Sequence, residues 1–245
     1  MIYMGSKARI AKDILKVMQP DIDKTGCFVD MFCGGGNLLQ FVNAKHIIAN
    51  DINSYVVAFL EKLQKEGYDW LPKDNREFTK EDYKYAKNYK EVYDKPMLGH
   101  IGYNLSFGGK WFGGWAYSPK ENWRDRVAEA YRGAIKQHNN LVGKNIAFYN
   151  LSYDKAPFED NCVIYCDIPY KGATKYKTDF NHDKFYEWCR KVKKENDKLG
   201  NNVIIYVSEY NMPEDFKCVW QKEIKMTLDK NSNSKKAVEK LFKLK

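Results

Sequence analysis

Asn161-Cys-Val-Ile-Tyr-Cys-Asp-Ile-Pro-Tyr170 is the stretch of sequence that decides the fold. Its apolar and aromatic part, Cys162–Cys166, has the length and β-branching of a buried strand rather than a helix. Pro169 lacks a backbone N–H and has a fixed φ, so the chain turns directly after Asp167. In open α/β sheets this end of a strand faces the ligand crevice. The stretch therefore predicts a binding site, although an Asp that only caps the turn explains it equally well.

Two more predicted strands end in the same way nearer the amino terminus. Residues 27–32 form a buried strand followed by Cys33-Gly-Gly-Gly36, where glycines allow a ligand to approach the backbone closely. The next strand, 46–50, ends at Asp51, about 20 residues after that turn, where an acidic side chain can accept the hydroxyls of a ribose. This order favours a nucleoside site over the alternative, in which Asp51 only caps the following helix.

Composition limits the function classes. The 245 residues include 41 Lys and Arg against 32 Asp and Glu, a net charge of +9. This excess suggests a nucleic acid partner, although a Lys-rich composition as such explains it equally well. No apolar run approaches the roughly 18–20 residues needed to cross a bilayer, and the first residues do not resemble a signal peptide. We therefore expect a cytoplasmic protein with no membrane partner.

The six cysteines do not predict a metal site. They lie at positions 27, 33, 162, 166, 189 and 218, with no Cys-x-x-Cys pair and no Cys/His spacing typical of zinc. Several lie in apolar runs, where cysteine behaves as a small hydrophobic residue. We expect them to be reduced and structural, and we expect no metal.

The middle of the chain, residues 64–144, has a different character. Gly102–Pro119 contains two Gly-Gly pairs and several large aromatic residues around Lys110, which suits a mobile loop. Residues 122–137 follow as a basic helix that includes Arg124 and Arg126. We interpret 64–144 as a mainly helical lobe that contacts the partner through these three basic residues. A lid over a small-molecule site is the alternative.

The flanking parts, 1–63 and 145–245, read as one α/β domain because strands and helices alternate along them. A helix beginning at Ser6 should end at Pro20. The last strand should span 219–228, and a polar loop with a short basic segment should follow over 231–245.

Four motifs together resemble a known family. They are Tyr3-x-Gly-Ser-Lys7, Phe28-Val-Asp-Met-Phe-Cys-Gly-Gly-Gly36, Asn50-Asp-Ile-Asn53 and Tyr165-Cys-Asp-Ile-Pro-Tyr170. In this order, with the lobe before the last motif, they resemble the Dam-type DNA adenine-N6 methyltransferases of the α arrangement. The resemblance implies a Rossmann-like methyltransferase fold with an inserted target-recognition lobe, S-adenosylmethionine as methyl donor and double-stranded DNA as partner.

The resemblance also assigns roles to residues. The implied donor-binding residues are Tyr3, Lys7, Asp30, Phe32, Gly34, Gly36, Asp51, Ile52 and Asp167. The implied catalytic residues are Asp167, Pro169 and Tyr170. Asp167 and the carbonyl of Ile168 or Pro169 would accept the two N6 hydrogens of an adenine that has been flipped out of the duplex, and Tyr170 would stack on its ring.

One position departs from the family pattern. The usual motif is Asp-Pro-Pro-Tyr, whereas Ile168 replaces the first proline here. Isoleucine keeps the carbonyl and can adopt the extended conformation favoured before a proline, so we expect activity to survive. A methyltransferase acting on RNA, an inactive DNA-binding relative and a small-molecule methyltransferase remain as alternatives, and the recognition sequence stays open.

Overall fold

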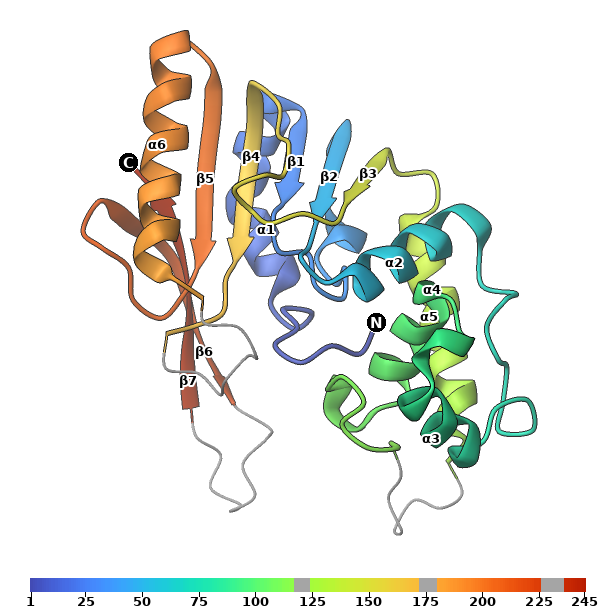
Figure 1. Cartoon of the computed structure of the whole chain (residues 1–245). Coiled ribbons are helices and arrows are strands. Elements are labelled where there is room, and N and C mark those ends of the chain that lie inside the picture. The colour runs from blue at the N-terminus through green and yellow to red at the C-terminus, as the bar shows by residue number, and fades with distance from the viewer. Residues whose placement is uncertain (117–123, 172–179, 226–235) are drawn as a thin grey trace.

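A seven-stranded mixed sheet forms the centre of the molecule in the computed structural model, which describes residues 1–116, 124–171, 180–225 and 236–245 (Figure 1). The strand order is β3-β2-β1-β4-β5-β7-β6, and only β7 runs antiparallel to its neighbours. The strands are β1 Cys27–Asp30, β2 His46–Asn50, β3 Ile146–Tyr149, β4 Asn161–Asp167, β5 Asn202–Ser208, β6 Phe216–Lys225 and β7 Lys236–Leu244. The predicted α/β, Rossmann-like fold is confirmed.

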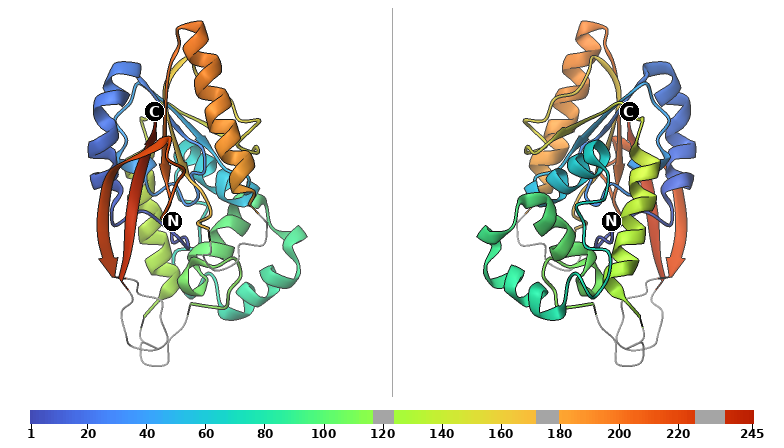
Figure 2. Two further views of the ribbon diagram at one scale, coloured as in Figure 1. Left: turned by 90° about the vertical axis from the view of Figure 1, so that its left-hand side faces the viewer. Right: turned by 90° about the vertical axis from the view of Figure 1, so that its right-hand side faces the viewer.

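Helices on opposite faces of the sheet bury the central strands completely. Figure 2 shows α1 (Ala11–Thr25) on one face and α6 (His182–Leu199) on the other. Alternate side chains of β4 divide between the two cores: Val163 packs on the α1 side and Ile164 on the α6 side. This two-sided burial explains why the strand reads as one continuous apolar run.

The remaining helices gather on the far side of β3. They are α2 Ser54–Glu66, α3 Lys80–Asn88, α4 Lys95–Gly99 and α5 Arg126–Leu141, with short turns of helix η1 Leu39–Phe41, η2 Lys90–Val92, η3 His100–Asn104 and η4 Phe107–Gly109. Asn53 caps α2 by accepting from the backbone of its first turn, and Thr79 and Asp82 form a capping box on α3.

The predicted mobile loop is in fact packed over its described part. Leu105 is fully buried, and Tyr83 Oη lies 2.7 Å from Ser106 Oγ. The glycines serve this packing, because a Cβ at Gly102 would lie 2.4 Å from the ring of Trp111. Aromatic residues between glycines therefore built a small core here rather than an open loop, and residues 117–119 of the prediction lie outside the described residues.

Pro20 does not end the first helix, contrary to expectation. It lies inside α1, which continues to Thr25 and ends at Gly26 in the left-handed conformation. A proline inside a helix removes one hydrogen bond. The burial of Ile22, two residues beyond Pro20, offsets this loss by holding the last turn against the sheet.

The carboxyl-terminal segment forms a strand that the sequence analysis missed. β7 inserts between β5 and β6, where Leu241 and Phe242 are buried. Its many charged residues suggested a loop, but in the strand Lys240 and Lys243 stay partly exposed while Leu241 and Phe242 face the two cores.

Among the described residues, no helix combines the length and the apolar character needed to cross a bilayer.

The contact between α4 and α2 gives a test of how firmly the lobe is packed. A Cβ at Gly99 would lie 2.3 Å from the carbonyl oxygen of Tyr55 and 3.0 Å from Cβ of Phe59. We expect Gly99→Ala to lower the free energy of unfolding by about 1–3 kcal/mol through overpacking. Gly133→Ala, on an open face of α5, should raise it by about 0.5–1 kcal/mol. Urea denaturation of both variants measures this, and equal responses would contradict the close packing.

Candidate active site

Three aspartates come together where β1, β2 and β4 end. β1 lies between the other two strands, and Asp30 is aligned with Ala49 of β2 and Tyr165 of β4. Asp51 and Asp167 each follow two residues after those partners, so all three carboxyl groups lie at the same edge of the sheet. The structure thus brings together the acidic residues that the sequence predicted to share a site.

Lys7 reaches this edge and binds Asp167. Its Nζ lies 2.8 Å from Asp167 Oδ1, 3.9 Å from Glu239 Oε2 and 4.5 Å from the centre of the Tyr170 ring. Tyr170 in turn donates a hydrogen bond of 2.6 Å to Glu239. The sequence predicted a helix from Ser6, which would place Lys7 in its first turn. Lys7 instead lies in the turn before α1, and this position lets it face Asp167 and Tyr170.

Burial and mutual repulsion raise the pKa values of the carboxyl groups. Burial raises the pKa of Asp167, and the Lys7 ammonium opposes that rise. The pKa of Asp30 lies well above its usual range, first because of burial and then because of Asp167 and Asp51. Among the described residues, Asp30 Oδ1 is a buried oxygen with no hydrogen-bond partner. The edge therefore holds an excess of acidic groups and is suited to a cationic ligand.

The glycine turn and Asp51 form a fixed unit. Asp51 accepts hydrogen bonds of 2.8 Å from the backbone N–H groups of Gly34 and Asn53. Gly34 has a φ of +46°, and a Cβ there would lie 2.9 Å from the Tyr3 ring. Gly36 also has a positive φ, of +66°. Each Asp51 oxygen keeps a second lone pair, so this unit can still accept from a ligand.

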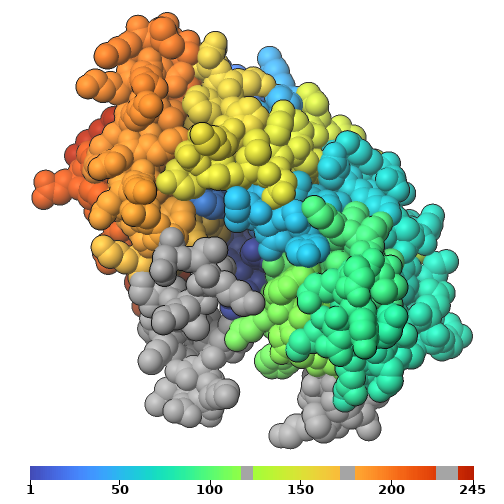
Figure 3. All heavy atoms as spheres, viewed as in Figure 1, coloured from blue at the N-terminus to red at the C-terminus, as the bar shows by residue number. Residues whose placement is uncertain are grey.

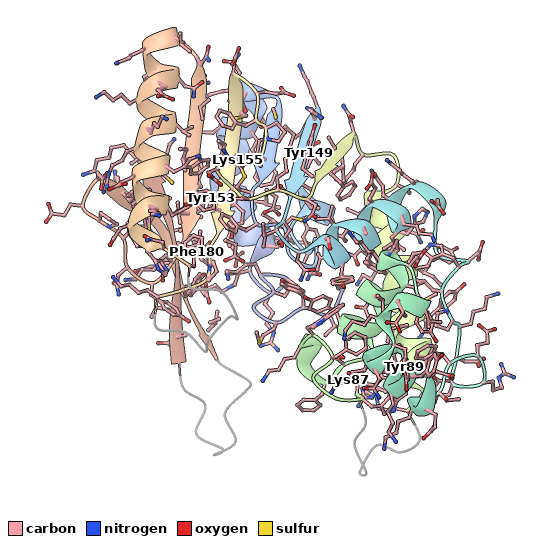
Figure 4. All side chains as sticks on the ribbon, viewed as in Figure 1. Lys87, Tyr89, Tyr149, Tyr153, Lys155 and Phe180 are labelled. Carbon is pink, nitrogen blue, oxygen red and sulfur yellow. The ribbon has the colours of Figure 1, made fainter. Side chains whose placement is uncertain are left out.

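Two apolar residues predicted to bind the donor lie on different sides of this unit. Phe32 packs against Tyr153 and Phe180 on the α6 side, and Figure 4 shows these two partners near the ends of the strands. Ile52 directly follows Asp51 and is 70% exposed. Its side chain is therefore available to cover a flat ligand, whereas Phe32 belongs to an aromatic cluster.

The predicted nucleic-acid contacts lie on the lobe. Lys110 is exposed in the turn after η4. Arg124 Nε and Arg126 Nη1 lie 2.6 Å and 3.0 Å from the carboxylate of Glu129. Figure 3 shows the amino-terminal residues at the floor of a hollow between the lobe and the sheet domain. The structure leaves the role of these three basic residues as a prediction.

The sequence analysis missed several groups beside the catalytic motif. Glu239 enters from β7, the strand that was mistaken for a loop. His182 and Glu209 contact the backbone next to Tyr170. Asn50, which is buried, donates 3.0 Å hydrogen bonds to the carbonyl groups of Met31 and Leu151 and so ties three strand ends together. Glu209 follows the apolar run 203–207, and a polar residue at the end of such a run is a usable signal for a site. No such signal marks Glu239.

A cluster of possible metal ligands lies at the opposite, amino edge of the sheet. Ligand atoms of Cys27, His46 and Glu159 all lie within 4.8 Å of one another. Spacing along the sequence could not indicate this group, because adjacent strands bring its members together. Glu159 already hydrogen-bonds both His46 and the Cys27 thiol, so these contacts satisfy the cluster as it stands.

A family model for the D12 class of N6 adenine-specific DNA methyltransferases matches residues 3–230. The chain belongs to this family. The match includes all of the predicted donor and catalytic residues, whereas Glu239 lies beyond it. Membership in the D12 class confirms the resemblance inferred from the four motifs.

Two individual proteins are similar to this D12-class chain. The type II methyltransferase M.FokI of Planomicrobium okeanokoites is 28% identical over 212 residues, which cover 77% of this chain and 31% of that protein. The chain thus spans less than a third of this relative. A crystal structure from Haemophilus influenzae, described as that of a methylase, has 13% sequence identity and a TM-score of 0.37, with 96% of this chain and 88% of that one covered.

The buried Asp30 carboxyl predicts a pH dependence of stability. The folded protein holds a proton on this group that the unfolded chain releases near pH 3.8, so stability falls as the pH rises above that value. Asp30→Asn removes the ionisable group and can donate to the neighbouring carboxylates. We expect this variant to be about 1–3 kcal/mol more stable than the wild type at pH 8, with a difference that shrinks toward pH 4.

Urea denaturation across this pH range measures the difference. Asp160→Asn, at an exposed position before β4, is the matched control and should follow the wild type. If Asp30→Asn were less stable than the wild type at pH 8, the interpretation that the buried Asp30 carboxyl destabilises the folded protein at high pH would be wrong.

Proposed function

We propose that this protein is a site-specific DNA adenine-N6 methyltransferase that uses S-adenosylmethionine. The observation that carries the proposal is the Asp167-Ile-Pro-Tyr170 motif at the end of β4, with Lys7 bound to its carboxylate. Membership in the D12 class supports the reaction, and the net charge of +9 suits a DNA substrate. The proposed location is the cytoplasm. M.FokI is a type II methyltransferase, and this relative suggests a role in restriction-modification.

The donor pocket suits a cationic ligand. Asp30 Oδ1 is buried without a partner and can accept from an ammonium group, while Asp51 and Ile52 are placed to hold a nucleoside. Tyr3, Lys7, Phe32, Gly34, Gly36 and Asp167 complete the proposed donor site. S-adenosylmethionine would supply an electrophilic methyl group on a sulfonium centre, which an acidic pocket stabilises.

Two acceptors can orient the adenine amine. The lone pair of this amine is delocalised into the ring, so the nitrogen is a poor nucleophile. Asp167 can accept one N6 hydrogen and the carbonyl of Ile168 the other. The carbonyl of Pro169 is already an acceptor for His182, at 2.9 Å. As nitrogen gains the methyl group and positive charge, Asp167 stabilises that charge and can take the released proton.

The flipped base needs a surface to stack on. Tyr170 follows the turn made by Pro169, and its ring is held by Glu239 and by an edge contact with Tyr210 at 4.6 Å between ring centres. A target adenine must leave the duplex to reach this site. Ile168 is buried and keeps the carbonyl that the mechanism needs, so its replacement of proline is compatible with an active enzyme.

The lobe, 64–144, would read the DNA. Lys110, Arg124 and Arg126 would contact it together with neighbouring side chains such as Lys87 and Tyr89, which Figure 4 shows on the lobe. Glu129 fixes both arginine side chains, so they are oriented before DNA arrives. Preorganised guanidinium groups lose less entropy on binding phosphate or a base edge.

Asp167→Ala should reduce methyl transfer by at least about 100-fold, as the loss of other preorganised polar groups does. Transfer of labelled methyl from S-adenosylmethionine to unmethylated DNA, followed by nucleoside analysis, measures the rate and identifies the product. Asp160→Ala, at the other end of β4, is the control. Unchanged transfer by Asp167→Ala would refute the mechanism, and label in RNA instead of DNA would refute the substrate.

Replacing Lys110, Arg124 and Arg126 by glutamine should weaken DNA binding and reduce its salt dependence. Each lost phosphate contact lowers the slope of log K against log salt by about 0.9, so the triple variant should lose up to about 2.7. Glutamine is chosen because a reversed charge would also repel Glu129. Lys24, Lys194 and Lys198, near the amino edge of the sheet, form the control set. Identical slopes in both triple variants would refute the lobe assignment.

A further inference from the structure

His182 binds the backbone of the catalytic motif from outside it. It is the first residue of α6, and its Nε2 lies 2.9 Å from the carbonyl oxygen of Pro169. A carbonyl can only accept, so Nε2 must carry the hydrogen. The edge of the Phe180 ring and the Tyr186 ring lie beside the imidazole, at 5.1 Å and 6.3 Å between ring centres. The imidazole is therefore held in place, and only 15% of its side chain is exposed.

Glu209 holds the same region from the end of β5. It is 1% exposed and accepts hydrogen bonds from the backbone N–H groups of Lys171, at 2.9 Å, and of Tyr210, at 2.6 Å. Its Oε2 lies 3.7 Å from His182 Nε2. His182 binds the backbone of Pro169 and Glu209 binds the backbone of Lys171. The two side chains thus hold the chain on both sides of Tyr170, the residue proposed to stack on the base.

These contacts fix the orientation of the peptide plane between Pro169 and Tyr170, because the carbonyl of Pro169 is bound by His182 and the N–H of Lys171 is bound by Glu209. We propose that His182, supported by Glu209, is a positioning residue that holds the Pro169 carbonyl away from the target amine and leaves Ile168 and Asp167 as its acceptors. This proposal rests on the methyltransferase function proposed above.

A purely structural role for His182 at the start of α6 is not needed. Asn181 already caps the helix by accepting a 2.9 Å hydrogen bond from Lys184 N. The imidazole instead reaches back across the intervening chain to Pro169. A contact of this kind supports the active site, because an error of about 1 Å in orientation can cost roughly 100-fold in rate.

Two substitutions separate the hydrogen bond from the volume of the ring. His182→Gln keeps a nitrogen donor at a similar reach, whereas His182→Phe keeps a ring without a donor. We expect His182→Phe to lower kcat for methyl transfer by about 10- to 100-fold with little change in KM for DNA or in donor affinity, and His182→Gln to recover most of the rate. His138→Phe is the matched control. His138, on α5, also contacts a backbone carbonyl, because its Nδ1 lies 2.7 Å from the carbonyl oxygen of Leu63, away from the Asp167–Tyr170 motif.

Fluorescence of 2-aminopurine at the target position adds a second readout. In His182→Phe we expect the base to flip out normally but to stack less well on Tyr170. The emission of 2-aminopurine should therefore change while the fraction of DNA bound stays the same. Equal losses in His182→Phe and His138→Phe, equal losses in His182→Gln and His182→Phe, or a loss confined to KM would each overturn the proposal. Thermal denaturation of the variants identifies any general loss of folding.

Nitrogen NMR of the labelled histidines in the full-length protein tests the contact without any turnover. A proton on Nε2 of His182 with a hydrogen-bonded shift is expected, and an Nδ1-protonated neutral ring would overturn the proposal. If the wild type transfers no methyl group while this signal is present, the proposed function fails and the His182 contact stands. If methyl transfer occurs and the His182 signal is absent, the proposed function stands and the proposed His182 contact fails.

Discussion

The ion pair between Lys7 and Asp167 joins the first motif of the sequence to the last. Both side chains are largely buried, at 11% and 21% exposure, so the pair itself adds little net stability once desolvation is counted. Its value is positional. Burial, Glu239 and Glu209 oppose the ionisation of Asp167, and the charge of Asp167 in turn raises the pKa of Asp30. In the proposed mechanism, Lys7 is the cation that keeps Asp167 an acceptor-only carboxylate at the point where the adenine amine would be oriented.

A cluster of buried acids costs folding energy, and the architecture around it supplies the compensation. The central strands are buried on both faces, with fully buried residues such as Phe28 and Phe185 on opposite sides of the sheet. Such a rigid base can hold groups that would separate in a looser structure. In the proposed function, the unpartnered oxygen of Asp30 would accept from the ammonium group of the donor, so this residue would serve binding rather than stability.

The sequence could predict only those site residues that are marked by local chemistry. Asp30, Asp51 and Asp167 each stand at or directly after the end of an apolar run, and parallel strands bring such ends to one edge of the sheet. Glu239 and His182 carry no such mark. Glu239 lies in a charged segment that becomes a strand only because β5 and β6 flank it, and His182 acts through a carbonyl thirteen positions earlier. Tertiary pairing, rather than propensity, decides both positions.

The proposed donor site and the lobe share one packed boundary, through the segment that holds Tyr3. Ile2 N donates a 2.8 Å hydrogen bond to Asn104 Oδ1, and Met4 N donates to Gly109 O at 3.3 Å, so the segment holding Tyr3 is bound to the lobe on both sides. The Tyr3 ring also covers the glycine turn. A shift of the lobe on DNA would therefore move a wall of the donor pocket, which gives occupancy of the two sites a direct physical route of coupling.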